Sequence, residues 1–145
     1  MVALAAAKDV TELDSILGME HEEGLAATQV VFQGALLVIS AAGTLAVATT
    51  ALNLVAAGIA QEARNSTDLA AGALTCRFRS GIFPFANSGG GDAIAQANVG
   101  ENCFIVDDQT VALTDGGGTR STAGRIYRVN AAATEVSVVI QYPLA

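Results

Sequence analysis

The residues of this chain that could do chemistry are few, and their spacing fits no catalytic or metal-binding pattern. The single histidine, His21, lies in an acidic stretch, so a serine or cysteine nucleophile has only one poor candidate base. Cys76 and Cys103 form no CxxC pair, and the chain lacks the ligands of a zinc site. Each cysteine lies in an apolar alternating stretch and is interpreted as a small hydrophobe, although a single disulfide between them stays open. We expect no catalytic residue, no cofactor and no enzymatic activity.

Acidic and glycine-rich segments offer two further kinds of site. Asp107, Asp108 and Asp115 carry the hard oxygen ligands that calcium prefers, but their spacing is not that of an EF-hand. Acids at strand ends are more typical of turns and caps. The glycine runs at 89–91 and 116–118 lack the lysine and the helix start of a phosphate-binding loop. We therefore interpret both features as turns and loops and expect no metal site.

Arginine is the remaining functional candidate. Seven basic and fourteen acidic residues give a net charge of −7, which has the wrong sign for a phosphate backbone, so nucleic acid is not an expected partner. Beyond residue 23 every basic residue is an arginine, whose planar fork suits ion pairs at interfaces. The candidate contacts for an acidic partner are Arg77, Arg79, Arg125 and Arg128. Scattered solubilising charges are the alternative interpretation.

The elements that position these residues begin with an acidic N-terminal segment. Residues 1–23 carry one lysine against six acids and lack the basic start and apolar run of a signal peptide. We interpret residues 1–29 as an arm, either a short helix or, preferably, an extended segment that is flexible or ordered by a partner. The candidate contacts of this arm with a neighbouring subunit are Leu13, Ile16 and Leu17.

Residues 24–61 contain no charged side chain, which is the strongest anomaly in the sequence. One interpretation is a small membrane-associated protein that uses this segment. Against it, threonine, glutamine and asparagine recur through the segment, and no cluster of lysine or arginine flanks it. The preferred interpretation is a set of strands buried on both faces, within a core or against another chain. We therefore expect no membrane partner.

Apolar and polar residues alternate along the chain between glycine-rich turns, which predicts a mainly β protein. Residues 45–60 are ambiguous because they also fit a helical stripe, but Gly58 and its β-branched neighbours favour a strand over residues 52–62. Pro84 indicates a sheet edge or bulge, and Asp92 the N-cap of one helical turn. The expected fold is a small β-barrel or sandwich over residues 30–145, with one short helix and the N-terminal extended arm. The expected strands lie near residues 30–40, 52–62, 73–85, 102–113, 123–130 and 135–142.

Strict alternation along the expected strand near residues 123–130 also assigns its side chains to faces. It places Arg125 and Tyr127 on one face and Ile126 and Arg128 on the other.

Several stretches together carry a resemblance to a known family. In chain order they are FQGALLV (32–38), LVAAGIA (54–60), RFRSGIFPFANS (77–88), DAI (92–94), Gly100, CFIVDDQTV (103–111) and TRSTAG (119–124). Over roughly residues 30–130 the chain resembles the small capsid decoration, or cement, proteins of tailed bacteriophages.

This resemblance implies a structural protein of the virion that is not an enzyme. Proteins of this family bind the outer surface of an assembled icosahedral shell and stabilise it, commonly as trimers. The implied partners are the major capsid protein and further copies of this chain, with residues 30–145 as the decoration domain. The implied location is the capsid exterior, after a period in the host cytoplasm during assembly. Low charge agrees with this interpretation, because such a chain has surface to bury between subunits.

Overall fold

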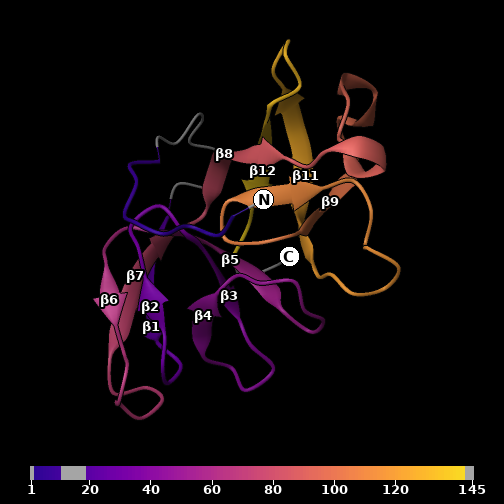
Figure 1. Cartoon of the computed structure of the whole chain (residues 1–145). Helices are drawn as coiled ribbons and strands as arrows, with labels where there is room; N and C mark the ends of the chain where they lie inside the picture. Colours follow the sequence, from indigo (N-terminus) through magenta and orange to yellow (C-terminus); the bar gives the residue numbers. More distant parts are fainter. Residues whose placement is uncertain (1, 11–18, 143–145) are drawn as a thin grey trace.

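This computed structural model describes residues 2–10 and 19–142 of the chain. The fold consists mainly of two β-structures packed on each other. One is a closed barrel of five strands in the order β10–β8–β12–β11–β9, and the other is a sheet in the order β1–β7–β5–β3–β4. Figure 1 shows the barrel at the upper right and the sheet at the lower left. The barrel strands are β8 (Gly81–Asn87), β9 (Asn102–Ile105), β10 (Thr110–Ala112), β11 (Thr122–Val129) and β12 (Glu135–Ile140). The sheet strands are β1 (Glu20–Gly24), β3 (Leu36–Ile39), β4 (Leu45–Val47), β5 (Val55–Ala60) and β7 (Thr75–Arg79), while β2 (Val30–Val31) and β6 (Arg64–Asn65) form a separate ribbon.

The expected fold class, a mainly β protein with a small barrel, is confirmed. Each expected strand region contains at least one strand, and residues 30–40, 73–85 and 102–113 are divided into two strands each, the second of these regions by Ser80 alone. The ambiguous residues 45–60 contain two strands, β4 and β5, and no helix. The sequence did not indicate β1, β4 or β6. The residues of β1 and β6 are charged or polar and pair only with distant parts of the chain, and β4 is a strand of three residues that also fitted a helical stripe.

The expected helical turn near Asp92 takes a different form. Two 3₁₀ helices are present, η1 (Gly90–Asp92) and η2 (Gln96–Asn98). Asp92 ends η1 and caps no helix, because its carboxylate accepts hydrogen bonds from Thr114 and Arg120 instead.

Pro84 was expected at a sheet edge or bulge, and the structure places it inside β8 of the closed barrel. At this position β8 is paired on one side only, because Pro84 faces Ser137 of β12 while the pairing with β10 begins at Ala86. Pro84 therefore occupies a local gap in the ladder, where the missing N–H leaves no partner unsatisfied.

Strands β3 and β5 are buried on both faces, as the absence of charge from residues 24–61 predicted. Leu36 and Val38 of β3 join the barrel side chains in one apolar core. Leu37, between them, packs with Cys76 and Phe78 of β7 in a second core. These strands therefore belong to two cores at once, and a charge on either face would be buried without solvent.

Small residues in β5 let the neighbouring strand approach closely. A Cβ atom at Gly58 would lie 2.1 Å from the carbonyl oxygen of Arg79 and 3.2 Å from the Phe78 ring. A bulge beside Gly58, between Leu37 and Val38 of the partner strand, adjusts the register so that the side chains of β5 serve both cores.

Part of the segment expected as an arm belongs to the sheet. Strand β1 pairs antiparallel with β7 along its whole length. The chain then continues to the opposite edge, where Leu25 forms a bridge to Leu45 of β4 and Ala26 N–H donates to the Leu45 carbonyl at 2.8 Å. Residues 20–26 therefore tie the two edges of the sheet together.

Residues 2–10 form an extended segment, the strap, that crosses the junction between sheet and barrel. Leu4 N–H donates to the Asp108 carboxylate at 2.8 Å, and Lys8 N–H donates to the Gln33 carbonyl at 2.9 Å. Gly34 makes this approach possible, because a Cβ atom there would lie 2.4 Å from the Lys8 carbonyl oxygen. The strap covers Asp108, which is 3% exposed.

Burial raises the pKa of the Asp108 carboxyl above its usual value. The hydrogen bond from Leu4 N–H acts in the opposite direction, and the nearby Asp107 raises the pKa further. The folded protein therefore keeps a proton on Asp108 at a pH where the unfolded chain has lost it. Stability contributed at this site falls as the pH rises through that interval and stays lower at neutral pH.

We expect Gly58→Ala to lower the free energy of unfolding by about 1–3 kcal/mol, because the new methyl group collides with the β7 backbone. Urea unfolding followed by circular dichroism measures the change. Gly89→Ala is the control, because a Cβ atom there meets nothing within 4 Å and Gly89 has an extended φ of −111°. Equal stability of the two variants would contradict the close approach of β5 and β7.

We expect Asp108→Asn to remove the pH-dependent loss of stability, because asparagine keeps an oxygen for Leu4 N–H and carries no charge. The free energy of unfolding of the variant relative to the unsubstituted chain should rise as the pH increases from about 4 to about 7. Urea unfolding across this range measures it. Asp68→Asn, which removes one carboxyl group at an exposed site, is the control. Identical profiles for all three proteins would show that Asp108 is not buried by the strap.

Candidate binding groove

The four arginines proposed from the sequence as interface residues lie on two different β-structures. Arg77 and Arg79 belong to β7 of the sheet, whereas Arg125 and Arg128 belong to β11 of the barrel. The structure therefore does not bring all four into one patch, and each pair needs its own explanation.

Arg77 already has acidic partners within the chain. Its Nη2 atom lies 3.2 Å from Glu62 Oε2 and its Nη1 atom 3.5 Å from Glu20 Oε1. Across the strand pair, Glu20 faces Arg79 and Glu22 faces Arg77. The carboxylates of β1 thus supply acidic neighbours for the arginines of β7. The complementary segments EHEE (20–23) and RFR (77–79) are the signal in the sequence that could have revealed this pairing.

Burial opposes the ionisation of Glu62, but its hydrogen bonds with Arg77 and the nearby Arg64 guanidinium outweigh that effect. The pKa of the Glu62 carboxyl is therefore lower than usual, and the pKa of Arg77 is raised by the same contact. Arg77 therefore stabilises the sheet through its ion pairs with Glu62 and with Glu20 of β1.

Arg125 and Arg128 share one exposed face, which strict alternation did not predict. The register of β11 against β12 shifts between Ile126 and Arg128, so one bulged residue, Tyr127, changes the phase of the strand. Ile126 stays in the barrel core at 2% exposure while both arginines point outward. The expectation that Arg125 and Arg128 occupy opposite faces is wrong for this reason. The proposed arm contacts Leu13, Ile16 and Leu17 lie outside the described residues.

A groove leads to Arg125 between the start of β5 and strand β11, and Arg128 lies outside the residues that line it. It consists of two depressions, of about 360 Å³ and 310 Å³, that share residues 122–124. Leu52 and Val55 line the first depression, and Arg125 lines the second. The groove therefore has an apolar end and a cationic end.

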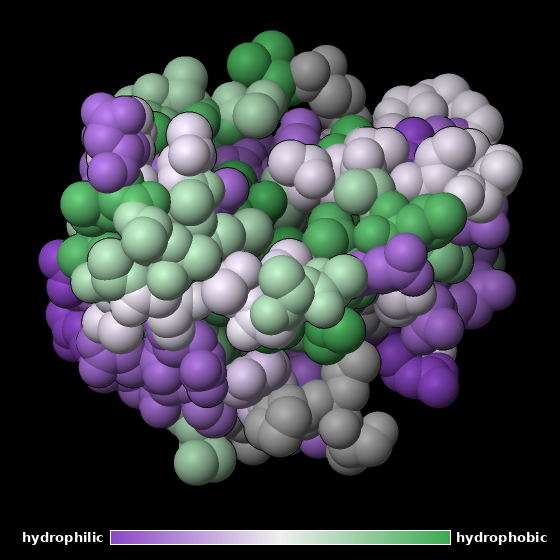
Figure 2. Space-filling view, turned by 90° about the horizontal axis from the view of Figure 1, so that it is seen from below, coloured by the Kyte–Doolittle hydropathy of each residue, from purple (hydrophilic) through white to green (hydrophobic). Residues whose placement is uncertain are grey.

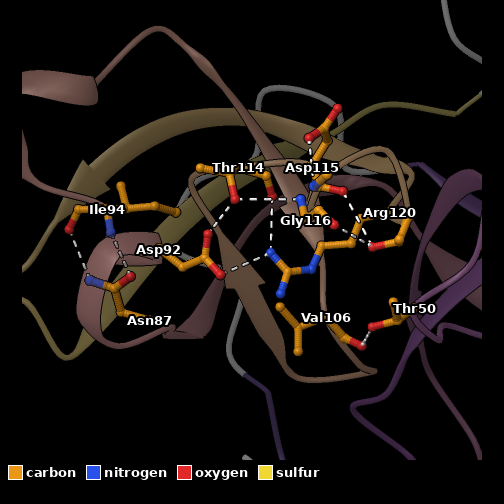
Figure 3. Close-up of polar contacts among 11 residues, drawn as sticks. Thr50, Asn87, Asp92, Ile94, Val106, Thr114, Asp115, Gly116 and Arg120 are labelled. Carbon is orange, nitrogen blue, oxygen red and sulfur yellow. Dashed lines mark hydrogen bonds and ion pairs between the residues drawn. The ribbon is translucent and has the colours of Figure 1, made fainter.

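Hydrogen bonds fix the loop that forms the apolar end. The Ser121 hydroxyl, 7% exposed, accepts from Leu54 N–H at 3.1 Å and donates to the Ala51 carbonyl at 2.7 Å. Thr50 donates to the Val106 carbonyl at 2.7 Å (Figure 3). These bonds attach the loop before β5 to the barrel, so the first depression has a fixed shape.

A second polar cluster fixes the glycine-rich loop beside the groove. Arg120 Nη1 lies 3.1 Å from Asp92 Oδ2 and donates to the Thr114 carbonyl at 3.1 Å, while the Thr114 hydroxyl donates to Asp92 (Figure 3). The hydrogen bonds from Thr114 and then from Arg120 hold the pKa of Asp92 below its usual value. Asn87 exchanges two hydrogen bonds of 2.9 Å with the backbone of Ile94 in the adjoining loop. Arg120 lines the groove with its charge already matched.

The loops at the lower end of the molecule expose a surface with almost no charge. They comprise residues 25–29, 40–44, 48–54 and 66–74, and Asp68 is their one charged residue. We call this surface the loop end. Seen from below, the centre of the molecule is white and green, and hydrophilic residues gather at the margins (Figure 2). Among the exposed large apolar side chains, Leu52 (54%) and Leu69 (42%) belong to these loops.

The remaining candidates for chemistry have structural roles. Cys76 and Cys103 are free and buried, and burial raises the pKa of their thiols to about 11 and about 12. The His21 ring stacks on Phe78 with the ring centroids 5.4 Å apart and meets Tyr142 edge-on. Residues 2–10 and 19–142 contain no cluster of three or more potential metal ligands.

No protein-family model, curated protein or solved structure matches this chain. Within the residues that the structure describes, no helix has the length and apolar character needed to cross a membrane.

We expect Ser121→Ala to lower the free energy of unfolding by about 1–3 kcal/mol, because it leaves the Leu54 N–H and the Ala51 carbonyl without their partner. Hydrogen exchange at the Leu54 amide should accelerate more than exchange in the barrel strands. Ser88→Ala is the control, because the Ser88 side chain makes no hydrogen bond with the residues that the structure describes, and only its backbone N–H donates, to the Val111 carbonyl. Unchanged exchange at Leu54 would contradict the attachment of the loop through Ser121.

Proposed function

We propose that this protein is a virion structural protein that binds the outer surface of an icosahedral bacteriophage capsid and stabilises it. The observation that carries the proposal is the loop end, which is almost free of charge in a chain of net charge −7 and exposes Leu52 and Leu69. Such a surface is suited to burial against another protein. The resemblance of residues 30–130 to capsid decoration proteins supports the major capsid protein as the proposed partner.

Apolar contact of this kind is weak at one site and strong when repeated. Burial of apolar surface contributes about 25 cal/mol per Å² before the cost of association is subtracted. A protein that binds only the assembled shell shifts the equilibrium toward the assembled state by mass action. Attachment of several linked copies to neighbouring shell subunits multiplies the retention. We therefore propose that the protein acts as a homo-oligomer, specifically a trimer.

Rigid loops support the same function. Ser121 and Thr50 attach the loop before β5 to the barrel, so binding would immobilise few additional residues there. A surface that is ordered before binding loses less conformational entropy on association. Fixed shape and low charge together favour a docking role over catalysis, and we propose that the protein is not an enzyme.

We propose the capsid exterior as the location of the protein, after a period in the host cytoplasm. Electron microscopy of purified particles tests this directly. The expected result is density for the β-barrel and sheet on the outside of the shell, with like copies in contact around three-fold positions. Particles that lack the chain on their outer surface would overturn the proposal, and isolated single copies on the shell would overturn the trimer.

We expect Val55→Glu to weaken binding to shells about tenfold or more, because a carboxylate at the rim of the loop end would have to be buried beside Leu52. Co-sedimentation of the purified protein with undecorated shells measures the affinity. Val99→Glu is a matched control: the two valines are 39% and 41% exposed, and Val99 follows η2 on the barrel. Equal loss in both variants would indicate a general charge effect and contradict a role of the loop end.

A further inference from the structure

Arg125 and Arg128 differ from the arginines whose pairing is described above. Arg64, Arg77 and Arg120 each form an ion pair with a carboxylate of the chain. Neither Arg125 nor Arg128 has a carboxylate within ion-pairing distance among the described residues, and both are exposed. In a chain with twice as many acids as bases, two adjacent arginines without an internal acid are available to an external one.

Both guanidinium groups are held in place by neutral contacts. Arg125 Nη1 donates to the Gly100 carbonyl at 2.7 Å. The Cζ atom of Arg128 lies 5.3 Å from the centroid of the Tyr127 ring, within the range of a cation–π contact. These contacts orient the side chains and leave further N–H donors free, since a guanidinium carries five. The pair is thus ordered in advance for bidentate carboxylates.

The groove that leads to Arg125 favours an extended chain over a compact ion, and Arg128 lies beyond its lining, further along β11 on the same exposed face. Its two depressions join at residues 122–124 and lead from Leu52 and Val55 to Arg125. Asn102 and Gln141 line the cationic end, and their amides can hydrogen-bond a peptide backbone. Residues 125 and 128 are separated by at most about 10 Å along the bulged strand. Two acidic residues two positions apart on an extended peptide share one face at a spacing of about 7 Å, which two long arginine side chains can reach.

We propose that this groove takes an extended acidic segment of the capsid shell subunit, with its carboxylates on Arg125 and Arg128 and an apolar side chain against Leu52 and Val55. The inference rests on the proposed function for the identity of the partner. The chemistry of the groove stands separately on the contacts described above. The loop end and the arginine pair then form one continuous surface, apolar at one end and cationic at the other.

A synthetic probe tests the chemistry on the full chain without particles. The probe is a fluorescein-labelled peptide, Leu-Thr-Glu-Thr-Glu-Thr-Leu, and its control carries glutamine in place of both glutamates. We expect the acidic peptide to bind in low salt, the glutamine peptide to bind at least about tenfold more weakly, and added salt to weaken the acidic peptide alone. Equal affinity for the two peptides would overturn the proposal.

Variants assign the binding to the arginine pair. The affinity of R125Q/R128Q for the acidic peptide should be lower than that of the unsubstituted chain by about tenfold or more. A97E/A63E is the matched control, because it changes the net charge by the same −2 at exposed sites outside the groove and the loop end and should bind as the unsubstituted chain does. Unchanged binding by R125Q/R128Q would overturn the proposal. So would tighter, arginine-dependent binding of inorganic tripolyphosphate, which would define a phosphate site.

Undecorated shells distinguish this inference from the proposed function. If the unsubstituted chain binds shells and R125Q/R128Q binds at least about tenfold more weakly than A97E/A63E, both the proposed function and the groove inference stand. If R125Q/R128Q binds shells as tightly as the unsubstituted chain, the groove inference fails and the proposed function survives. If the unsubstituted chain does not bind shells at all, the assignment to a shell subunit fails, whatever the peptide result.

Discussion

The rest of the fold depends on burying both faces of β3 and β5. Leu36 and Val38 contribute to the barrel core, and Leu37 between them contributes to the core of the sheet. Two β-structures can share a layer in this way only if that layer carries no charge and few large side chains. The alanines and Gly58 of β5 meet the second condition, and the uncharged run of residues 24–61 meets the first. Loss of this shared layer would separate the molecule into two halves, each with an exposed apolar face.

Local patterns in the sequence were sufficient for the fold class and for most of the strands. Alternation around Cys76 and Phe78 identified β7, and the uncharged run identified the doubly buried strands. Features that depend on distant contacts were not accessible. The acidic residues of β1 look like a solvated arm until β7 is known to lie beside them. The path of the strap depends on Gly34 and Asp108, whose positions only the folded chain brings together.

The candidate groove shows the same limit. The sequence singled out Arg125 and Arg128, but alternation placed them on opposite faces, because a bulge at Tyr127 leaves no local mark in the sequence. It also grouped them with Arg77, whose acidic partners Glu20 and Glu62 are fixed by tertiary pairing. Once the internal ion pairs of Arg77 are known, Arg125 and Arg128 of β11 stand apart as arginines without an acidic partner. The absence of an internal partner, and not the positive charge alone, therefore identifies them as candidates for binding.

The way in which the strand edges are occupied affects how copies of this chain tolerate crowding. The barrel closes on itself, and the β4 edge of the sheet is met by Leu25, by Ala26 N–H and by the Gln29 side chain, which accepts from Val47 N–H at 3.0 Å. The β1 edge carries Glu20, Glu22 and Glu23, and like charges repel a second strand that approaches in register. At these two edges, backbone that could template cross-β stacking is thereby withheld or charged. Folded copies at high local concentration therefore have little opportunity to pair through these strand edges and start amyloid-like fibres. Contacts between copies that use side chains alone would leave this protection unchanged.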